Sequence, residues 1–459
     1  HQGQPPQEVS LVLARRASLP GPPFLFAPSF CYTEAMSETT NTGVSGCPQG
    51  ETFMKALRIF SVRHLRDIEI PLGDTGRKHL ILTGRNGCGK TSVLSALAKF
   101  LEYAVSTNYY SKEKLQKYLS NSQRQAEGLG QTEADRLERS RLEGHQKMWE
   151  SHLEPWTTGA VADFTSFADL REKYRKGEFI LAFYKDNREI KVEVSKNIEK
   201  VDLKTVYPIS EHPCRELVKY LVNLKTTEAF AKTSGNVARA KEIADWFARF
   251  EGILRRIYDD DALRLDFDID TFKFTIVQSG HEPFDFSTLS MGYAAVFDII
   301  GDLMMRMEAK RDYSLEGVVL IDEIETHLHV ALQKQIMPIL TDLFPNVQFV
   351  LSTHSPFILN STPNAIVYDL ETKTLAKNGL GDLPYAGIVE GYFGVDTLSQ
   401  TLREKFDAYR ALAEKKELTD EDFAKAAELE RYLDEIPDYL AVDFSEAYER
   451  MKLELGNKR

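Results

Sequence analysis

The sequence predicts an α/β fold in which several buried parallel strands end at one edge of a sheet. Three apolar runs lead to this prediction. Residues 79–83 run into a glycine-rich loop, residues 317–321 into two acids, and residues 348–353 into a histidine. Continuous apolar runs are typical of strands buried on both faces, and the carboxyl ends of parallel strands meet at the same edge. We therefore expect the three polar segments to form one site.

The glycine-rich loop begins at Gly84 and follows the spacing G-x-x-x-x-G-K-[ST] of a phosphate-binding loop. Glycines let backbone N–H groups turn toward a polyphosphate, which a Cβ atom would block. Lys90 would reach the β- and γ-phosphates, and the Thr91 hydroxyl would bind Mg²⁺. A helix over residues 91–101 would direct its positive end at the same anion. The residues expected to bind the nucleotide, ATP, are Gly84, Arg85, Asn86, Gly87, Cys88, Gly89, Lys90, Thr91 and Ser92.

The polar residues after the other two runs suit the hydrolysis of a nucleotide. Asp322 would hold the hydration shell of Mg²⁺, completing the metal site begun by Thr91. Glu323 is placed to polarise the attacking water as general base, and His354 would hydrogen-bond the γ-phosphate or that water. We therefore expect Glu323, His354 and Lys90 to be the catalytic residues.

Composition is that of an ordinary soluble globular protein: 459 residues, 42% hydrophobic and 27% charged, with a formal net charge of -12. No apolar run approaches the roughly 18–20 residues that span a bilayer, which excludes an integral membrane protein. The acidic balance argues against a protein that coats nucleic acid. The four cysteines lack the spacing of disulfide or metal sites, so we expect reduced thiols and a cytoplasmic location: Cys31, Cys47, Cys88 and Cys214.

Secondary-structure signals divide the rest of the chain. Residues 1–53 are rich in Pro, Gly, Ser and Thr, and we expect a disordered leader or an upstream extension, with Met36 or Met54 as the true start. Helical and hairpin patterns then separate the phosphate loop from the acids, as an insertion would. We expect two hairpins, one at 55–62 with 67–72 and one at 178–184 with 189–195, and a strand at 263–277. We expect helices at 106–156, with a bend at 128–130, at 212–258 and at 291–307. Three more helices are expected from 398 onward, two of them with capping boxes, at Thr419 and at Asp443.

Several stretches together resemble a known family. The runs at 322–329 and 351–357 look like those of the RecF/SMC/OLD branch of ATP-binding-cassette (ABC) ATPases. The stretches at 286–293 and 391–397 are similar to parts of compact ATPases from bacterial anti-phage systems, of the Septu- and retron-associated type. The resemblance covers about residues 54–400.

This resemblance implies that ATP is sandwiched in a head-to-head dimer. Ser290 and Gly292 would belong to the signature that contacts the nucleotide of the other subunit, and Arg63 matches a basic residue after the first strand of such heads. Two features depart from the family: the signature reads Ser-Met-Gly-Tyr, and no Gln can be assigned to the loop that usually completes Mg²⁺ ligation. The implied architecture is an α/β ABC head (54–105 and 286–397) with an inserted helical and β lobe (106–285) and a helical C-terminal segment (398–459).

Weaker signals have a structural and a functional interpretation. Asp266, Asp268 and Asp270 are expected to be a solvent-facing strand edge rather than a metal site, and Glu189-x-Lys191 a polar hairpin rather than half of a nuclease motif. Glu325, His327 and His329 suit the dimer-contact loop of the family better than a metal site. We expect no Toprim nuclease, with its Asp-x-Asp pair, after His354.

The resulting functional hypothesis is an ATPase that binds Mg-ATP as a homodimer, or a higher even-numbered oligomer, and hydrolyses it slowly. Its nucleotide state would control a separate effector, expected to be a nuclease, in defence against phage, with DNA as a further candidate partner and no membrane association. The biological role rests on the resemblance. The alternative is a DNA-repair clamp of RecF type, whereas the signature and the 325–329 run disfavour a membrane-transporter ATPase.

Overall fold

A computed structural model gives the fold from the first strand of the predicted head onward. The elements below belong to the unit Gly46–Arg459. The structure describes residues 50–107, 109–186, 198–362, 364–376, 380, 387, 400–415, 418–434, 448–453 and 455.

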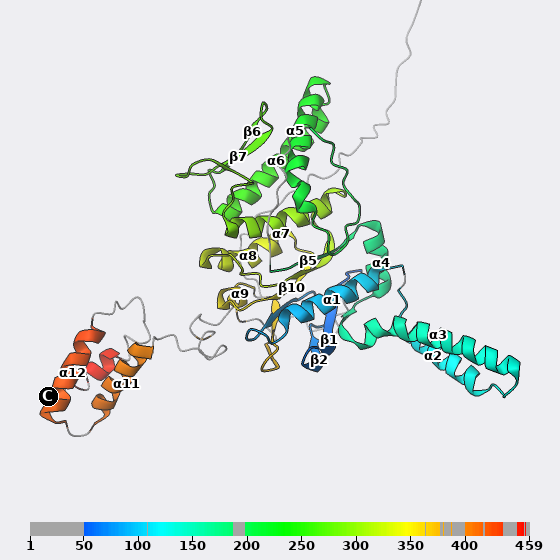
Figure 1. The fold of residues 1–459 in the computed structure, drawn as a ribbon. Helices are drawn as coiled ribbons and strands as arrows, with labels where there is room; N and C mark the ends of the chain where they lie inside the picture. The colour runs from blue at the N-terminus through cyan, green and yellow to red at the C-terminus, as the bar shows by residue number, and fades with distance from the viewer. Residues whose placement is uncertain are drawn as a thin grey trace, which may run out of the picture. The chain divides into compact units, whose positions relative to one another are not determined.

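A mainly parallel sheet carries the candidate site (Figure 1). Among the described residues its strands lie in the order β12-β11-β3-β10-β9-β5, and all neighbours are parallel except β12 with β11. The three apolar runs are therefore three adjacent strands, and the predicted α/β class is confirmed. The bounds are β3 His79–Thr83, β5 Phe179–Tyr184, β9 Glu316–Ile321, β10 Val347–Ser352, β11 Ala365–Asp369 and β12 Thr374–Ala376.

Side chains of each central strand alternate between two hydrophobic cores. Leu80 and Leu82 pack into the core that contains α1, whereas Ile81 packs into the core that contains α5 to α8. Val318 and Val319 divide between the same two cores. Because helices cover both faces, the strands contain apolar residues throughout, which is the pattern that predicted them. The bounds are α1 Lys90–Val105, α5 Leu217–Thr233, α6 Val237–Tyr258, α7 Met291–Glu308, α8 Val330–Leu343 and α9 Pro356–Asn360.

A second sheet, in the order β2-β1-β4, packs in the same core as α1. Its strands are β1 Met54–Val62, β2 Leu65–Pro71 and β4 Gly159–Phe164, and the antiparallel β1–β2 pair confirms the predicted hairpin. Both β4 and β5 come from the range predicted as an insertion, yet they pair with strands of the head, β1 and β9. The range 106–285 thus contributes to the head, while the domain boundaries remain a prediction.

A helical arm extends from the head between α1 and β4 (Figure 1). It consists of α2 Lys112–Glu127 and α3 Glu133–Thr157, which pack against each other and are joined at the predicted bend. The base of the arm is fixed to α1: the Tyr103 hydroxyl donates to the His152 carbonyl (3.2 Å), and the Trp156 ring lies edge-on to Phe100 at 5.2 Å. The helix α4, Phe167–Lys176, follows β4.

The lobe before α7 differs from its prediction in two ways. The single strand expected at 263–277 is a hairpin, β6 Arg264–Asp268 and β7 Lys273–Val277, with a short β8 Phe284–Asp285 beside it. Asp268 closes the turn, because its Oδ1 accepts from the backbone N–H groups of Asp270 (2.8 Å) and Thr271 (3.2 Å). The predicted helical region is interrupted: η1 Pro213–Glu216 precedes α5 and α6. The strand expected at 189–195 lies outside the described residues, so the predicted hairpin is not tested; β5 pairs in parallel with β9.

The C-terminal segment has a small core of its own. The helices α11 Gln400–Glu414 and α12 Asp420–Leu433 contribute to it, and the capping box of Thr419 with Asp422 is confirmed. The second predicted capping box, at Asp443, lies outside the described residues, although residues 448–453 are helical. Within the part of the chain that the structure describes, no helix has the length and apolarity needed to cross a bilayer.

Candidate nucleotide-binding site

The order of the strands places the predicted catalytic segments side by side. Because β10 lies between β3 and β9 and all three are parallel, the turn containing His354 emerges between the phosphate loop and the two acids. Two hydrogen bonds join the neighbouring strand ends: Thr353 N donates to Leu82 O (3.1 Å), and Ile324 N donates to Ser352 O (3.2 Å).

The phosphate loop has a conformation that depends on its glycines. Gly84 and Gly89 have φ values of 123° and 105°, a region that other residues rarely adopt. A Cβ atom on Gly84 would lie 3.0 Å from Cys88 Sγ and 3.3 Å from Asp369 Oδ1. Gly84 therefore lies close to the Cys88 thiol and to the end of β11, while Arg85, Asn86 and Gly87 are exposed.

Lys90 is a buried cation held by backbone carbonyl groups. Its residue is 5% exposed, and Nζ donates to the carbonyls of Gly84 (3.0 Å) and Arg85 (3.3 Å). Among the described residues no carboxylate lies within ion-pair distance of this ammonium. A buried charge without a counter-charge is costly, so the site has a strong electrostatic preference for an anion. The N-terminus of α1, which begins at Lys90, adds positive partial charge at the same point.

The acidic pair is fixed by a serine from the neighbouring strand. Asp322 is fully buried, and Ser352 Oγ donates to its Oδ1 (2.6 Å). The same Oγ accepts from the backbone N–H of Glu323 (2.8 Å), which has a φ of 45° in the left-handed region. Such a backbone costs of order 1 kcal/mol or more for a residue other than glycine, so it persists where neighbouring groups hold it. The result is a half-buried Glu323 carboxylate at the open end of β9.

A buried network supports Asp322 from the side of β5. Asp322 N donates to the carbonyl of Tyr184 (2.8 Å), whose hydroxyl donates to Asp302 Oδ2 (2.7 Å). Arg306 Nε donates to the same carboxylate oxygen (2.7 Å), and its guanidinium also donates to Leu181 O (3.0 Å). Both ends of this ion pair lie on α7, so the helix that follows the signature is tied to the strand beside Asp322.

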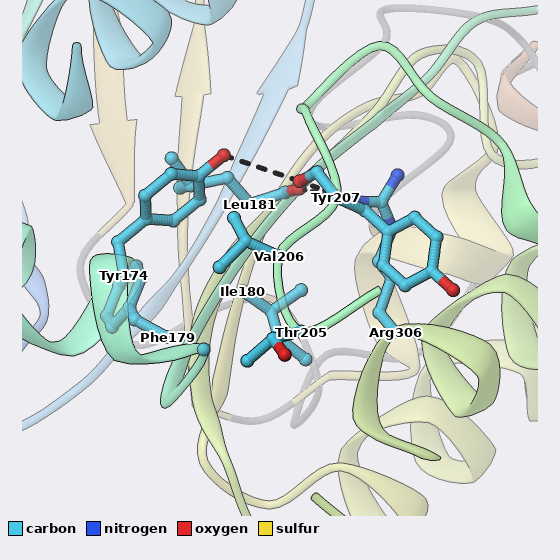
Figure 2. A pocket seen from close by; sticks show the side chains of 9 residues that line it. Tyr174, Phe179, Ile180, Leu181, Thr205, Val206, Tyr207 and Arg306 are labelled. Atoms are coloured by element: carbon cyan, nitrogen blue, oxygen red, sulfur yellow. Dashed lines mark hydrogen bonds between the residues drawn. The ribbon is translucent and has the colours of Figure 1, made fainter. Parts of the chain in front are cut away.

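The pocket next to Arg306 belongs to this supporting network and is not the candidate site (Figure 2). It is lined along β5 by residues such as Ile180 and Leu181, which precede the end of that strand, and on its other side by Tyr207. The Tyr174 hydroxyl donates to the Tyr207 carbonyl across it (3.3 Å). This hydrogen bond and those of Arg306 to Leu181 O and Tyr207 O link α4, β5 and α7 around the pocket.

His354 is half-buried at the start of the turn after β10. Its backbone N–H donates to Glu325 Oε1, and its ring Nε2 has no hydrogen-bond partner among the described residues. Burial and the Lys90 ammonium lower the pKa of the imidazole, against the opposing influence of Glu325 and Glu323. Because β10 lies between β3 and β9, the imidazole follows a strand that is flanked by the strands of the phosphate loop and of the acids.

Thr91 and Ser92 lie in the first turn of α1, where Thr91 is exposed. The strand that leads into the phosphate loop, β3, and the strand that leads into Asp322, β9, flank β10, so both segments emerge at the same edge of the sheet. With the buried ammonium of Lys90 and the open glycine backbone, the residues present therefore suit a Mg²⁺-bound nucleotide.

Arg63 lies in the turn between β1 and β2, which packs against the phosphate loop. A Cβ atom on Gly89 would lie 3.1 Å from Leu65 Cδ1 and 4.0 Å from His64 Cε1. Arg63 itself is exposed, with a φ of 51°. The structure thus brings the predicted basic residue to the rim of the loop.

Ser290 and Gly292 lie at the start of α7, away from the hydrogen bonds of the phosphate loop. Ser290 is exposed and caps α7 without a side-chain hydrogen bond, so its hydroxyl is available to a ligand. A Cβ atom on Gly292 would lie 2.8 Å from the carbonyl of His327, so the helix start packs against the segment after the acids. Among the described residues no hydrogen bond joins Ser290 or Gly292 to the loop of the same chain. Their role at a second subunit's nucleotide stays a prediction.

Residues near the site that were not predicted to act there come from neighbouring strands. Besides Ser352, Glu371 after β11 lies against the loop, where its Oε2 accepts from Arg85 N (3.2 Å). Asp369 holds that segment, since its Oδ1 accepts from Glu371 N (2.8 Å). Strand β11 was not predicted, although its fully buried Ala-Ile-Val-Tyr-Asp pattern was a usable signal.

The weaker candidates have structural partners. His329 caps α8, with its Nδ1 accepting from Leu332 N (3.4 Å). The sequence predicted no Asp-x-Asp pair of a nuclease after His354, but this spacing does occur at Asp420 and Asp422. Asp422 accepts from Lys415 Nζ (2.7 Å) and forms the capping box of α12. Glu189 and Lys191 lie outside the described residues, as do residues 391–397.

Comparisons with known proteins agree with the family resemblance of the sequence. A family profile described as "AAA domain, putative AbiEii toxin, Type IV TA system" matches residues 209–360. The Septu protein PtuA of Bacillus mycoides (strain KBAB4) is 25% identical over 381 residues, which are 79% of this chain and 48% of that protein. The Retron Vc95 probable ATPase of Vibrio cholerae serotype O1 biovar El Tor is 40% identical over 93 residues, 19% of this chain and 18% of that protein.

The chain thus spans about half, or less, of the length of the curated relatives it matches. Among solved structures, the SMC head domain from Thermotoga maritima matches with a TM-score of 0.32 and 12% identity, covering 69% of this chain and 94% of that one. The predicted resemblance to ABC-type ATPases of anti-phage systems is confirmed by the sequence relatives.

Proposed function

We propose that this chain, which resembles ATPases of the Septu and retron systems, binds Mg-ATP and hydrolyses it. The observation that supports the proposal most is the buried Lys90 ammonium, which has carbonyl partners but no carboxylate among the described residues. A triphosphate supplies the missing negative charge, and the glycine backbone with the α1 N-terminus supplies N–H donors around it. Bound Mg²⁺, held by Thr91 and Asp322, would neutralise charge on the β- and γ-phosphates.

In this proposal Glu323 takes the proton of the attacking water. Its carboxylate stands at the end of β9, and the neighbouring β10 brings His354 beside it. Ser352 anchors the backbone of Glu323 in the left-handed region, so the general base is oriented before the nucleotide arrives. His354 would donate to the γ-phosphate or to the water from its Nε2, which has no hydrogen-bond partner in the described part of the chain.

We further propose that two chains enclose the nucleotide. The exposed Ser290 and the start of α7 form an anion-binding helix terminus that no group of the same chain uses among the described residues. Met291 beside it is 70% exposed, so this end of α7 is accessible to a second chain. A second subunit's phosphate loop is the occupant expected from the family.

The relatives suggest the biological setting. They are named as components of Septu and retron systems, and we propose that this chain likewise serves in anti-phage defence, where its nucleotide state controls a separate effector such as a nuclease. The purified chain should hydrolyse ATP but leave DNA and RNA intact with Mg²⁺ or Mn²⁺, and cleavage should require the partner. Metal-dependent cutting by the chain alone, lost in Asp266→Ala or Glu189→Ala, would contradict this part of the proposal.

The central experiment measures nucleotide binding and turnover together. Wild-type protein at 100 times its Kd for ATP should gain about 2.7 kcal/mol of stability, and Lys90→Ala should lose that gain along with turnover. A surface control, Lys176→Ala, removes a lysine that pairs with exposed Glu172 and should change neither measurement. If ATP stabilises wild type and Lys90→Ala equally, the site is misassigned.

A further inference from the structure

We infer that Glu325 is a positioning residue for ATP hydrolysis, because its carboxylate fixes the peptide of His354 and so holds the imidazole at the phosphate loop. The inference rests on the proposed function and deepens it. The role of Glu325 is then distinct from that of Asp322 in metal binding and from that of Glu323 as general base.

The contact that carries the inference joins the segments after two adjacent strands. Glu325, in the segment after β9, accepts at Oε1 from the backbone N–H of His354, in the turn after β10. The acceptor is a side-chain carboxyl oxygen, and hydrogen bonds to carboxylates are about twice as strong as those between neutral groups. The bond holds the backbone of His354 itself, so it fixes the position of the Cα atom from which the imidazole side chain extends.

Other bonds hold the residues on either side of His354 but not its peptide N–H. Ser352, two residues earlier, is bound to the segment after β9 through Glu323 N. Ser355, one residue later, donates from Oγ to Gln333 Oε1 on α8 (2.6 Å). Thr353 N donates to Leu82 O (3.1 Å), and Ser355 N donates to Thr353 Oγ1 (2.9 Å). Among the described residues of the turn, the bond to Glu325 is therefore the one that holds the His354 peptide N–H itself.

Two polar atoms of the pair point to a ligand. Glu325 Oε2 and His354 Nε2 are both buried and have no hydrogen-bond partner among the described residues. Buried polar atoms are nearly always paired in folded proteins. Bound nucleotide and the attacking water would supply these partners, and the charged groups around the imidazole, Lys90, Glu323 and Glu325, are those that would surround a γ-phosphate.

A purely structural brace would use the same hydrogen bond, and the chain offers a matched control for it. Glu316 lies at the opposite end of β9, where its carboxylate also accepts from a backbone N–H, that of Thr52 (3.2 Å), and from Lys173 Nζ (2.7 Å). Loss of this carboxylate costs stability of the same sheet without touching the end that carries the site.

The experiment compares Glu325→Ala, Glu325→Gln and Glu316→Ala in the full-length chain by ATP turnover. Glu325→Ala should lower kcat about 10- to 100-fold, with KM for ATP within about threefold, because the phosphate loop is intact and only the imidazole is misplaced. Glu325→Gln should recover most of that loss, because its amide oxygen accepts the same N–H. Glu316→Ala should be less stable to urea but keep kcat within about twofold.

Three results would overturn the inference: a kcat for Glu325→Ala within twofold of wild type, an equal loss in Glu316→Ala, or a Glu325→Gln as slow as Glu325→Ala. If Glu325→Ala does not fold, the Gln variant decides the question on its own, because a kcat reduced tenfold or more would contradict a role as acceptor. A wild-type chain that does not hydrolyse ATP would refute the proposed function itself, a result distinct from any of these three.

Discussion

Replacement of Ser352 by alanine is the sharpest test of how the acidic pair is held. One hydroxyl group there serves two partners: it donates to Asp322 Oδ1 at 2.6 Å and accepts from Glu323 N at 2.8 Å. Both Ser352 and Asp322 are fully buried. The substitution removes one oxygen atom, a space smaller than a water molecule needs, so solvent does not replace either bond.

The expected loss follows from the two bonds. A hydrogen bond to a charged acceptor is worth about 1.5–3 kcal/mol and one from a peptide N–H about 0.5–1.5 kcal/mol, so Ser352→Ala should lower the free energy of unfolding by about 2–4 kcal/mol. The rate of ATP turnover should also fall, because Glu323 then loses one of the hydrogen bonds that hold its left-handed backbone conformation, φ 45°.

Urea unfolding and steady-state ATP turnover measure the two effects on the same protein. Ser361→Ala is the matched control, since its hydroxyl donates to a carbonyl of its own turn, that of Ile358 (2.9 Å), and should cost about 1 kcal/mol or less. A loss below about 0.5 kcal/mol in Ser352→Ala, with turnover unchanged, would refute the proposed role of the serine.

Three further outcomes are expected. The Glu323→Gln variant should still bind ATP but should not hydrolyse it, because the amide cannot accept the proton of water. It should accumulate as a dimer, which light scattering would detect, and full turnover would contradict the assignment. A mixture of Ser290→Arg and Lys90→Ala protomers keeps one intact composite site per heterodimer and should be more active than either parent, whereas no gain despite proven subunit exchange contradicts the sandwich. Burial lowers the pKa of His79 to about 4, so the folded state resists protonation and stability should fall by up to about 3 kcal/mol as pH drops from 6.5 to 4. The His79→Asn variant keeps an acceptor for Phe349 N, and its free energy of unfolding, measured with urea, should depend less on pH between 6.5 and 4. A dependence on pH equal to that of the wild type would contradict this.

The sequence predicted those parts of the site that are encoded locally. The conformation of residues 84–91 depends on glycines within the loop itself, and the β9 and β10 runs are recognisable because both faces of the sheet are buried. That His354 follows a strand neighbouring the acids was also predictable, since adjacent parallel strands bring their ends together.

Partners that depend on strand pairing were not predictable in the same way. The bonds of Ser352 to Asp322 and of Glu325 to His354 each span 29 or 30 residues, and they exist because β9 and β10 pair in one register. The membership of β4 in the head was missed because Gly-Ala-Val-Ala-Asp-Phe has small residues and follows a long polar helix, so only its pairing with β1 identifies it.

The helical arm is long, and its base is attached to α1. With 25 residues at 1.5 Å each, α3 is about 37 Å long, and a 5° rotation at its base displaces its tip by about 3 Å. The base is fixed to α1 through Tyr103 and Trp156, and α1 begins at Lys90. A tilt of α1 by about 5° carried rigidly into the arm would therefore move its tip by about the size of a side-chain contact, whereas the same angle within the phosphate loop would shift atoms by only a few tenths of an ångström.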